Sequence, residues 1–180
     1  MAIKTFSVGE VLTASDTNTY LANSGLVYVT STTVGSAVSS VTISNCFSST
    51  YDNYKIVWSN IDCSTGGVSM YVKIGNAATG YYGSQAYWTY AGATGVNNQN
   101  NATSLYCGSS DTTTCAGWFE LQGPYTTTYT HMSGMSYGSG ASTLNMGALE
   151  NTTSYTAFTF GPGSGTMTGG TITVYGYRKA

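Results

Sequence analysis

Residues 51–75 read YDNYKIVWSNIDCSTGGVSMYVKIG and predict a β-hairpin. Large apolar side chains of the first arm alternate with smaller or polar ones, and one face of this strand carries Tyr54, Ile56 and Trp58. The second arm, Val68 to Ile74, alternates in the same way, and two glycines between the arms suit a turn with positive φ. A hairpin of this size is marginal alone in water, so a second sheet or a second chain must cover its apolar face. The sequence therefore predicts a layered β fold.

The composition favours many short strands joined by tight turns. The chain has 180 residues, including Gly 23, Tyr 16 and only Pro 2, and 7% of its residues are charged. Charged residues make up about a quarter of typical soluble proteins, so hydroxyl and amide groups must supply much of the polar surface here. With 41% hydrophobic and 13% aromatic residues, the chain supports a packed interior.

Alternating segments recur along the chain at the spacing of a sandwich. Besides the hairpin, we predict strands within residues 26–30, 38–43, 115–122, 126–137, 142–148, 155–160 and 169–177. Residues 92–102 contain Gly, Asn, Ala, Thr, Gln and a single Val, and we predict a long exposed loop there. The predicted fold is an all-β, antiparallel, jelly-roll-like β-sandwich of about eight to ten strands, preceded by a short helix.

That helix is predicted from Thr13 or Ser15 to about Asn23. Either hydroxyl is suited to the N-cap, and Asp16 lies in the first turn, where the helix dipole favours a carboxylate. Gly25 is suited to end the helix in the left-handed conformation. Because the helix is short and weakly amphipathic, it must dock on another surface to be stable.

The charge pattern argues against nucleic-acid and membrane partners. The net charge is −2 and the pI is near 5.0, with only 5 Lys and Arg residues in the chain. No apolar run is long enough to span a membrane, and residues 1–10 lack the basic-then-apolar profile of a signal peptide. We therefore expect a soluble protein that is made without Sec-type export.

The residues that catalysis would need are scattered. Of the 7 acidic residues, no two form a recognisable pair for glycan hydrolysis, although folding could bring Glu120 and Glu150 together. His131 is the only histidine and follows no G-x-S-x-G motif, so a structural role, or a position facing a symmetry mate, is favoured over catalysis. The spacing of histidine and cysteine does not match a zinc site. We predict that the protein is not an enzyme and uses no metal and no cofactor.

Four cysteines occur without a C-x-x-C motif: Cys46, Cys63, Cys107 and Cys115. We predict that they are small buried thiols in a protein made in a reducing compartment. The alternative is that Cys107 and Cys115 face each other across the loop between them. Oxidation after release from the cell would then close a short disulfide.

The N-terminal stretch carries a motif. Residues 6–21 read FSVGEVLTASDTNTYL and resemble a segment near the N-terminus of virion structural proteins of tailed bacteriophages, described as minor tail, tail-fibre or head-fibre proteins. The matching positions that define the segment are Phe6, Gly9, Glu10, Val11, Leu12, Asp16, Asn18, Tyr20 and Leu21. The chain departs from the pattern at residues 23–25, where Asn-Ser-Gly stands instead of the Asn-Gln pair of many relatives. Residues 170–178, GTITVYGYR, resemble the closing strand of the same proteins.

This resemblance implies a non-enzymatic virion component that is often a homotrimer. It implies that residues 1–25 form an attachment segment that binds other virion proteins. Residues 26–180 would form the β-sandwich domain and face outward. The resemblance places the protein in the virion.

Aromatic residues between positions 81 and 90 are the candidate binding site. Tyrosine and tryptophan rings stack on sugars, and nearby Ser, Gln and Asn supply neutral hydrogen bonds. The candidates for binding a host-surface glycan are Tyr81, Tyr82, Tyr87, Trp88 and Tyr90. The alternative is that some of these residues lie in the core and the others pave a subunit interface.

Three functions stay open at this point. The first is a structural role in the virion as a tail component, head fibre or capsid decoration protein. The second is an adhesin that binds cell-surface glycan through residues 81–101. The third is a free carbohydrate-binding module, which the N-terminal motif disfavours because a secreted module would need an export signal.

Overall fold

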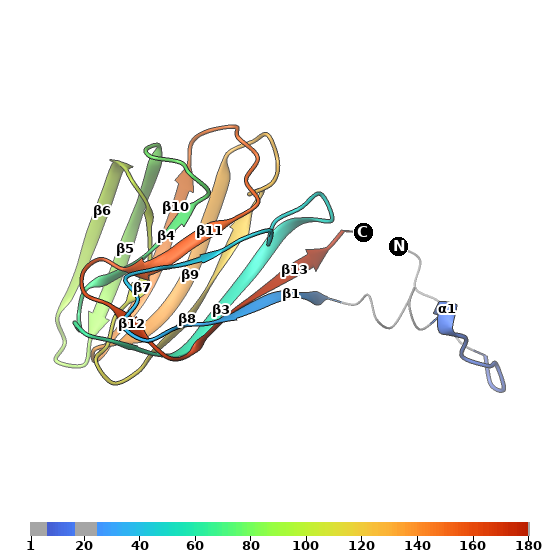
Figure 1. Ribbon diagram of the computed structural model, residues 1–180, viewed down its shortest axis with the longest axis horizontal. Helices are drawn as coiled ribbons and strands as arrows, with labels where there is room; N and C mark the ends of the chain where they lie inside the picture. The colour runs from blue at the N-terminus through green and yellow to red at the C-terminus, as the bar shows by residue number, and fades with distance from the viewer. Residues whose placement is uncertain (1–6, 17–24, 180) are drawn as a thin grey trace.

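The structure is a computed structural model that describes residues 7–16 and 25–179 (Figure 1). Thirteen strands and one short helix lie within these residues. In chain order they are α1 (Ala14–Asp16), β1 (Leu26–Thr33), β2 (Val41–Ile43), β3 (Tyr51–Cys63), β4 (Ser69–Ile74), β5 (Tyr81–Thr89), β6 (Thr94–Ala102), β7 (Leu105–Ser109), β8 (Cys115–Gln122), β9 (Thr130–Gly138), β10 (Ala141–Leu149), β11 (Phe158–Pro162), β12 (Met167–Thr168) and β13 (Thr171–Arg178).

The strands form two antiparallel sheets packed face to face, which confirms the predicted all-β sandwich. The larger sheet has nine strands in the order β1-β13-β3-β8-β9-β10-β5-β6, with β12 paired to β3 beside this path. The smaller sheet has four strands in the order β2-β11-β4-β7. The smaller sheet lies across the inner face of the larger one (Figure 1).

The hairpin predicted for residues 51–75 is wrong in its pairing, although both of its strands exist. β3 pairs with β13 and β8 in the larger sheet, whereas β4 pairs with β11 and β7 in the smaller sheet. Residues 64–68 therefore carry the chain from one sheet to the other. Gly67 N–H donates to the Ser110 carbonyl at 3.0 Å within this crossing. Because β3 and β4 lie on opposite sheets, the apolar face of each is covered by the other sheet. An isolated two-stranded hairpin would leave its apolar face exposed to water.

Aromatic rings from both sheets meet in the core. The ring centroid of Trp58 on β3 lies 5.3 Å from that of Phe160 on β11. The centroid of Phe119 on β8 lies 6.1 Å from that of Phe158 on β11. All four side chains are at most 1% exposed. Each such ring contributes about 1.5–3 kcal/mol through its burial, so this cluster is a main attachment between the sheets.

The indole of Trp58 fits only because its neighbours lack side chains. A Cβ atom at Gly108 or at Gly117 would lie 2.7 Å from the Cζ2 atom of Trp58, which is closer than real Cβ contacts. Glycine is otherwise unfavourable in the interior of a strand. These two glycines therefore serve the packing of the largest core residue.

The long loop predicted for residues 92–102 is instead β6, the edge strand of the larger sheet. It pairs with β5, from Trp88 opposite Thr94 to Tyr81 opposite Ala102, after a turn in which Gly92 has a φ of 82°. Asn and Gln are depleted in strands, so local propensity favoured a loop. Pairing with the neighbouring strand overrides that propensity. Strands β5, β7 and β12 were not predicted either.

Glutamine side chains close the edge of the smaller sheet at β7. Gln99 on β6 donates from Nε2 to the Ser104 carbonyl at 2.7 Å and accepts the Tyr106 N–H at 2.9 Å. Gln85 on β5 donates to the Gly108 carbonyl at 2.7 Å. An edge strand exposes unpaired N–H and C=O groups, and these side chains satisfy them as a further strand would.

A buried polar network continues inward from this edge. Gln85 Nε2 also donates to Asn145 Oδ1 at 2.9 Å, and Asn145 Nδ2 donates to Thr143 Oγ1 at 3.0 Å. The Thr143 hydroxyl lies 2.8 Å from that of Ser136, and all four residues are at most 7% exposed. Because these groups bond to one another, the network rigidifies its half of the core.

We expect Phe158→Ala to lower the free energy of unfolding by about 3–5 kcal/mol, because it leaves a cavity between the rings of Phe47 and Phe119. Urea unfolding followed by tryptophan fluorescence measures this change. Thr171→Ala, at an exposed position on β13, is the control and should change the free energy of unfolding by no more than about 0.5 kcal/mol. A loss below about 1 kcal/mol in Phe158→Ala would contradict the packing described.

Candidate functional site

The structure separates the five aromatic residues that were predicted to bind glycan. Tyr81 is fully buried, and its hydroxyl accepts the Ile74 N–H at 2.8 Å and donates to the Ile74 carbonyl at 3.3 Å. The prediction that Tyr81 binds a ligand is therefore wrong, because it is a core residue that no ligand can reach. Tyr87 shares the inner side of β5 by strand alternation and lies against Gly95 of β6.

The other three aromatic residues lie on or beside the outer face of the larger sheet. Trp88 is 48% exposed and Tyr90 is 76% exposed, whereas Tyr82 is half-buried. Tyr90 stacks on Tyr137 of β9 with ring centroids 6.0 Å apart. Tyr82, Trp88 and Tyr90 are therefore the members of the predicted set that can contact a partner or ligand on this face.

The outer face of the larger sheet also carries an apolar row that crosses six neighbouring strands. The register places one apolar side chain of each strand beside that of the next. The apolar row consists of Val57 (β3), Trp118 (β8), Met135 (β9), Leu144 (β10), Ala86 (β5) and Val96 (β6). Strands lie about 4.8 Å apart, so the row is roughly 24 Å long. Met135 is 49% exposed and Val96 is 58% exposed, and the other four side chains of the row are half-buried.

Sequence reasoning missed this row, although one signal pointed to it. β9 carries one methionine on each face, with Met132 on the buried side and Met135 on the exposed side. The outer face of an antiparallel sheet usually carries polar residues. Strands of this kind therefore indicate a second covered face, but only the register shows that the apolar positions line up.

Lys55 and Glu120 form a neutral pair beside the row on this face. Lys55 Nζ lies 3.9 Å from Glu120 Oε1 and 4.5 Å from the centroid of the Trp118 ring. The Tyr177 hydroxyl donates to the same carboxylate oxygen. Burial and this hydrogen bond raise the pKa of Tyr177 to about 12, so the phenol stays uncharged at neutral pH. The Lys55–Glu120 pair adds no net charge to the face, and the exposed carboxylate of Asp62 lies further along β3.

Thr13 caps α1, as the sequence predicted. Its Oγ1 accepts the Asp16 N–H at 3.1 Å, and Asp16 Oδ2 accepts the N–H and the hydroxyl of Thr13 at 3.1 Å and 2.6 Å. Gly25 has the expected left-handed φ, at 85°. The remainder of the predicted helix lies outside the described residues. The attachment residues that lie outside them are Phe6, Asn18, Tyr20 and Leu21.

The described part of the predicted attachment segment is exposed. Gly9 has a φ of 87° within a turn that the Glu10 N–H closes by donating to the Ser7 carbonyl at 3.0 Å. Val11 is 78% exposed and Leu12 is 49% exposed. The segment therefore presents apolar side chains outward instead of burying them in the sandwich.

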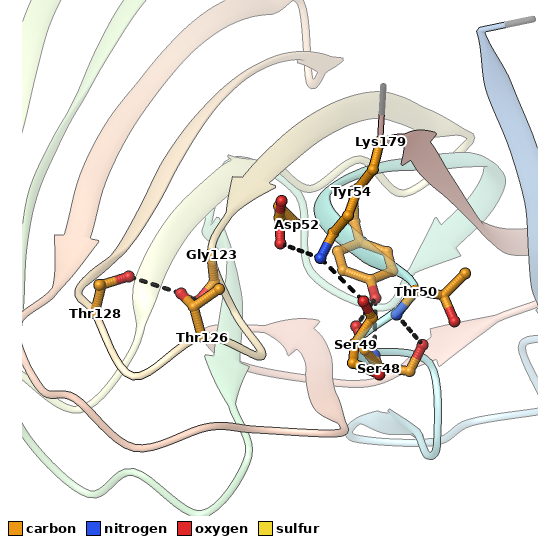
Figure 2. Close-up of polar contacts among 9 residues, drawn as sticks. All are labelled: Ser48, Ser49, Thr50, Asp52, Tyr54, Gly123, Thr126, Thr128 and Lys179. Atoms are coloured by element: carbon orange, nitrogen blue, oxygen red, sulfur yellow. Dashed lines mark hydrogen bonds and ion pairs between the residues drawn. The ribbon is translucent and has the colours of Figure 1, made fainter. Parts of the chain in front are cut away.

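Polar contacts hold the loop of residues 48–50, which precedes β3, at the end of the sandwich where the chain leaves β13 (Figure 2). Lys179 Nζ lies 2.7 Å from Asp52 Oδ1 and donates to the Ser49 carbonyl at 3.0 Å. The Tyr54 hydroxyl accepts the Ser48 N–H at 2.8 Å and donates to the Ser48 carbonyl at 3.0 Å. These contacts fix residues 48–52 against the end of β13 and against Tyr54 of β3.

Acidic side chains of the sandwich domain serve structural contacts. Asp111 accepts the Thr113 N–H at 3.0 Å and the Ser139 N–H, and these hydrogen bonds hold the pKa of its carboxyl below the ordinary value. The carboxylate of Glu120 is engaged by Lys55 and Tyr177. Within the described part of the chain, no group of three or more His, Cys, Asp or Glu side chains could hold a metal ion.

All four cysteines are buried free thiols, as predicted. Burial raises the pKa of Cys46 to about 12 and raises the pKa of Cys107 well above its ordinary value. The sulfur of Cys115 lies 3.9 Å from that of Cys63, so Cys115 contacts Cys63 and not Cys107. The alternative pairing of Cys107 with Cys115 does not match this arrangement.

No known protein family and no curated protein matches this sequence. Among residues 7–16 and 25–179, no helix is long and apolar enough to cross a membrane.

We expect Cys46 and Cys107 to resist iodoacetamide at pH 8 in the native protein. Only a thiolate reacts, and burial keeps both thiols protonated and inaccessible. Mass spectrometry of peptides from the native and the urea-unfolded protein measures the modification. Both cysteines should react fully once the chain is unfolded, and rapid labelling of either one in the native state would contradict its burial.

Proposed function

We propose that this chain is a structural component of a tailed-phage virion, most simply a homotrimeric tail or fibre protein exposed on the particle. Residues 1–25 serve as the attachment segment and residues 26–180 as the outward-facing β-sandwich domain. The resemblance of residues 6–21 to the N-terminal segment of such proteins supports the virion assignment. The apolar row on the larger sheet supports the assembly of several copies.

The apolar row is the observation that carries the assembly proposal. Soluble monomers rarely expose contiguous apolar patches of this kind. Interface cores are enriched in aromatic residues and Met and depleted in Lys, Glu and Asp, which is the composition of the apolar row. The Lys55–Glu120 pair is internally neutral, so copies that meet through this face experience little like-charge repulsion.

The attachment segment is proposed to bind another virion protein. Its exposed apolar residues are Val8, Val11 and Leu12, at 108%, 78% and 49%. A capped helix start at Thr13 next to these residues gives them a defined local structure. A short helix of this kind gains stability by docking, so a partner surface is expected to complete it.

A host-receptor adhesin is the second candidate, because Trp88 and Tyr90 expose aromatic surface. Trp88 lies opposite Ser142 of β10, which provides a hydroxyl beside the indole. An aromatic ring next to a neutral hydroxyl is suited to a sugar. The same residues are equally suited to the rim of a subunit interface, so the experiment below separates the two roles.

We expect Met135→Lys to convert the homotrimer to a monomer, because it places a charge at the centre of the apolar row. Sedimentation velocity at micromolar concentration measures the change in mass. Thr152→Lys adds the same charge at an exposed position between β10 and β11 and should leave the trimer intact. A wild-type chain that sediments as a monomer would contradict the proposal of a trimer.

Purified particles of the phage that encodes this chain test the virion assignment. Mass spectrometry should detect the chain in the particles, and immunogold labelling should place it on the tail, on a fibre or on the capsid. Absence of the chain from the particles would overturn the assignment. Glycan-array binding that Trp88→Ala abolishes, together with an unchanged trimer, would favour the adhesin.

A further inference from the structure

A groove on the smaller sheet lies apart from the apolar row and takes no part in the proposed assembly. It has a volume of about 700 Å³, within the range of small-molecule sites, and lies between β4, β7, the edge strand β6 and the residues that follow β11. The lining side chains that matter most are Ser69, Tyr71, Lys73, Asn97, Thr103 and Tyr106. This combination of aromatic, hydroxyl, amide and ammonium groups suits a polar ligand that also has an apolar surface.

Two tyrosines supply the aromatic surface of the groove. Tyr71 on β4 is paired with Tyr106 on β7, so the two side chains are neighbours on the outward face of the smaller sheet. Both are half-buried and keep part of their rings accessible. Gly161 on β11 leaves room for Tyr71, because a Cβ atom there would lie 3.0 Å from the Tyr71 hydroxyl. Each accessible tyrosine ring provides a flat surface on which a sugar ring can stack.

Glutamines from the larger sheet hold the polar groups of the groove in place. Gln85 is 3% exposed, and its Oε1 accepts the Ser69 hydroxyl at 2.8 Å and Asn97 Nδ2 at 3.3 Å. Gln99 accepts the Tyr106 N–H at 2.9 Å and so fixes the backbone beneath the second ring. Groups that are already ordered lose less conformational entropy on binding, and the groove is therefore preorganised.

Lys73 gives the groove its charge. It is the only charged side chain among the described residues that line the groove, and no carboxylate of the described chain pairs with it. Lys55 and Lys179, in contrast, each have a carboxylate partner. β7 begins opposite Val72, so Lys73 lies level with the turn of residues 103–104. An unpaired ammonium beside neutral hydrogen-bonding groups favours a carboxylate, to which it forms a charge-assisted hydrogen bond.

We propose that this groove binds a saccharide that carries a carboxylate, of the uronic or sialic acid type. The tyrosine pair contacts the sugar ring, the hydroxyl and amide groups bind its hydroxyls, and Lys73 binds its carboxylate. The site differs from the aromatic set predicted from residues 81–90 and shares only Asn97 with the wider region 81–101. The proposal depends neither on the virion assignment nor on the oligomeric state.

The test uses the full chain and a panel of defined oligosaccharides. The acidic members are tetragalacturonate, a hyaluronan tetrasaccharide and sialyllactose, and the neutral members are cellotetraose and lactose. We expect saturation-transfer NMR to detect at least one acidic member, and titrations to give a dissociation constant in the millimolar range or below. Raising the ionic strength should weaken this binding, because the carboxylate contact is screened by salt.

Two variants locate the binding in the groove. Lys73→Met keeps the aliphatic stem and removes the charge, so it should weaken acidic binding by about tenfold and abolish the preference over neutral sugars. Tyr71→Ala should weaken the binding of both kinds. Tyr129→Ala is the matched control, because Tyr129 is 47% exposed in the loop before β9 and does not line the groove. Circular dichroism and the urea midpoint establish that each variant is folded.

Three results would overturn the proposal. The first is that none of the acidic oligosaccharides binds to the wild-type chain. The second is that Lys73→Met, whose side chain lies at the surface of the smaller sheet, binds the acidic ligand as tightly as the wild type. The third is that neutral and acidic oligosaccharides bind equally well, because Lys73 would then contribute no contact with a carboxylate.

Discussion

The contact of Trp58 and Phe119 with Phe158 and Phe160 is the interaction on which the architecture depends. β3 and β8 present these rings from the larger sheet, and β11 presents its own from the smaller one. The crossing of the chain between β3 and β4 places the apolar face of β3 in the larger sheet and that of β4 in the smaller one, where both are buried in the shared core. The other strands of each sheet extend the two layers that this contact holds together.

The opposite half of the sandwich is held together by different physics. There Gln85 and Asn145 form a buried hydrogen-bonded network in place of aromatic rings, and Gln99 joins Gln85 in satisfying the edge of β7. Buried polar groups are costly unless they are paired, so their bonding requires one defined arrangement of β5, β6 and β7. The same bonds orient groups of the groove on the smaller sheet. Gln85 and Gln99 therefore both satisfy the edge of β7 and order the groove beside it.

The low charge content of the chain is related to the proposed assembly through the outer face of the larger sheet. A chain with 7% charged residues has few means of keeping an apolar face in water. Beside the apolar row the charges of Lys55 and Glu120 cancel, and Tyr177 remains a neutral phenol. In the proposed assembly, the apolar row with Met135 and Trp118 at its centre gains stability by meeting another apolar surface.

The sequence by itself determined the β class, the inward residues of β3 and β4, the burial of the cysteines and a helix N-cap at Thr13 or Ser15. These features depend on alternation, on composition or on contacts within a few residues, which local sequence specifies. Only the tertiary structure decided that β3 and β4 lie in different sheets and that residues 94–102 form a strand. It also decided that Tyr81 is buried while Trp88 is exposed. The apolar row and the groove arise from pairings between distant segments, and a shift of one residue in register would turn their side chains to the opposite face.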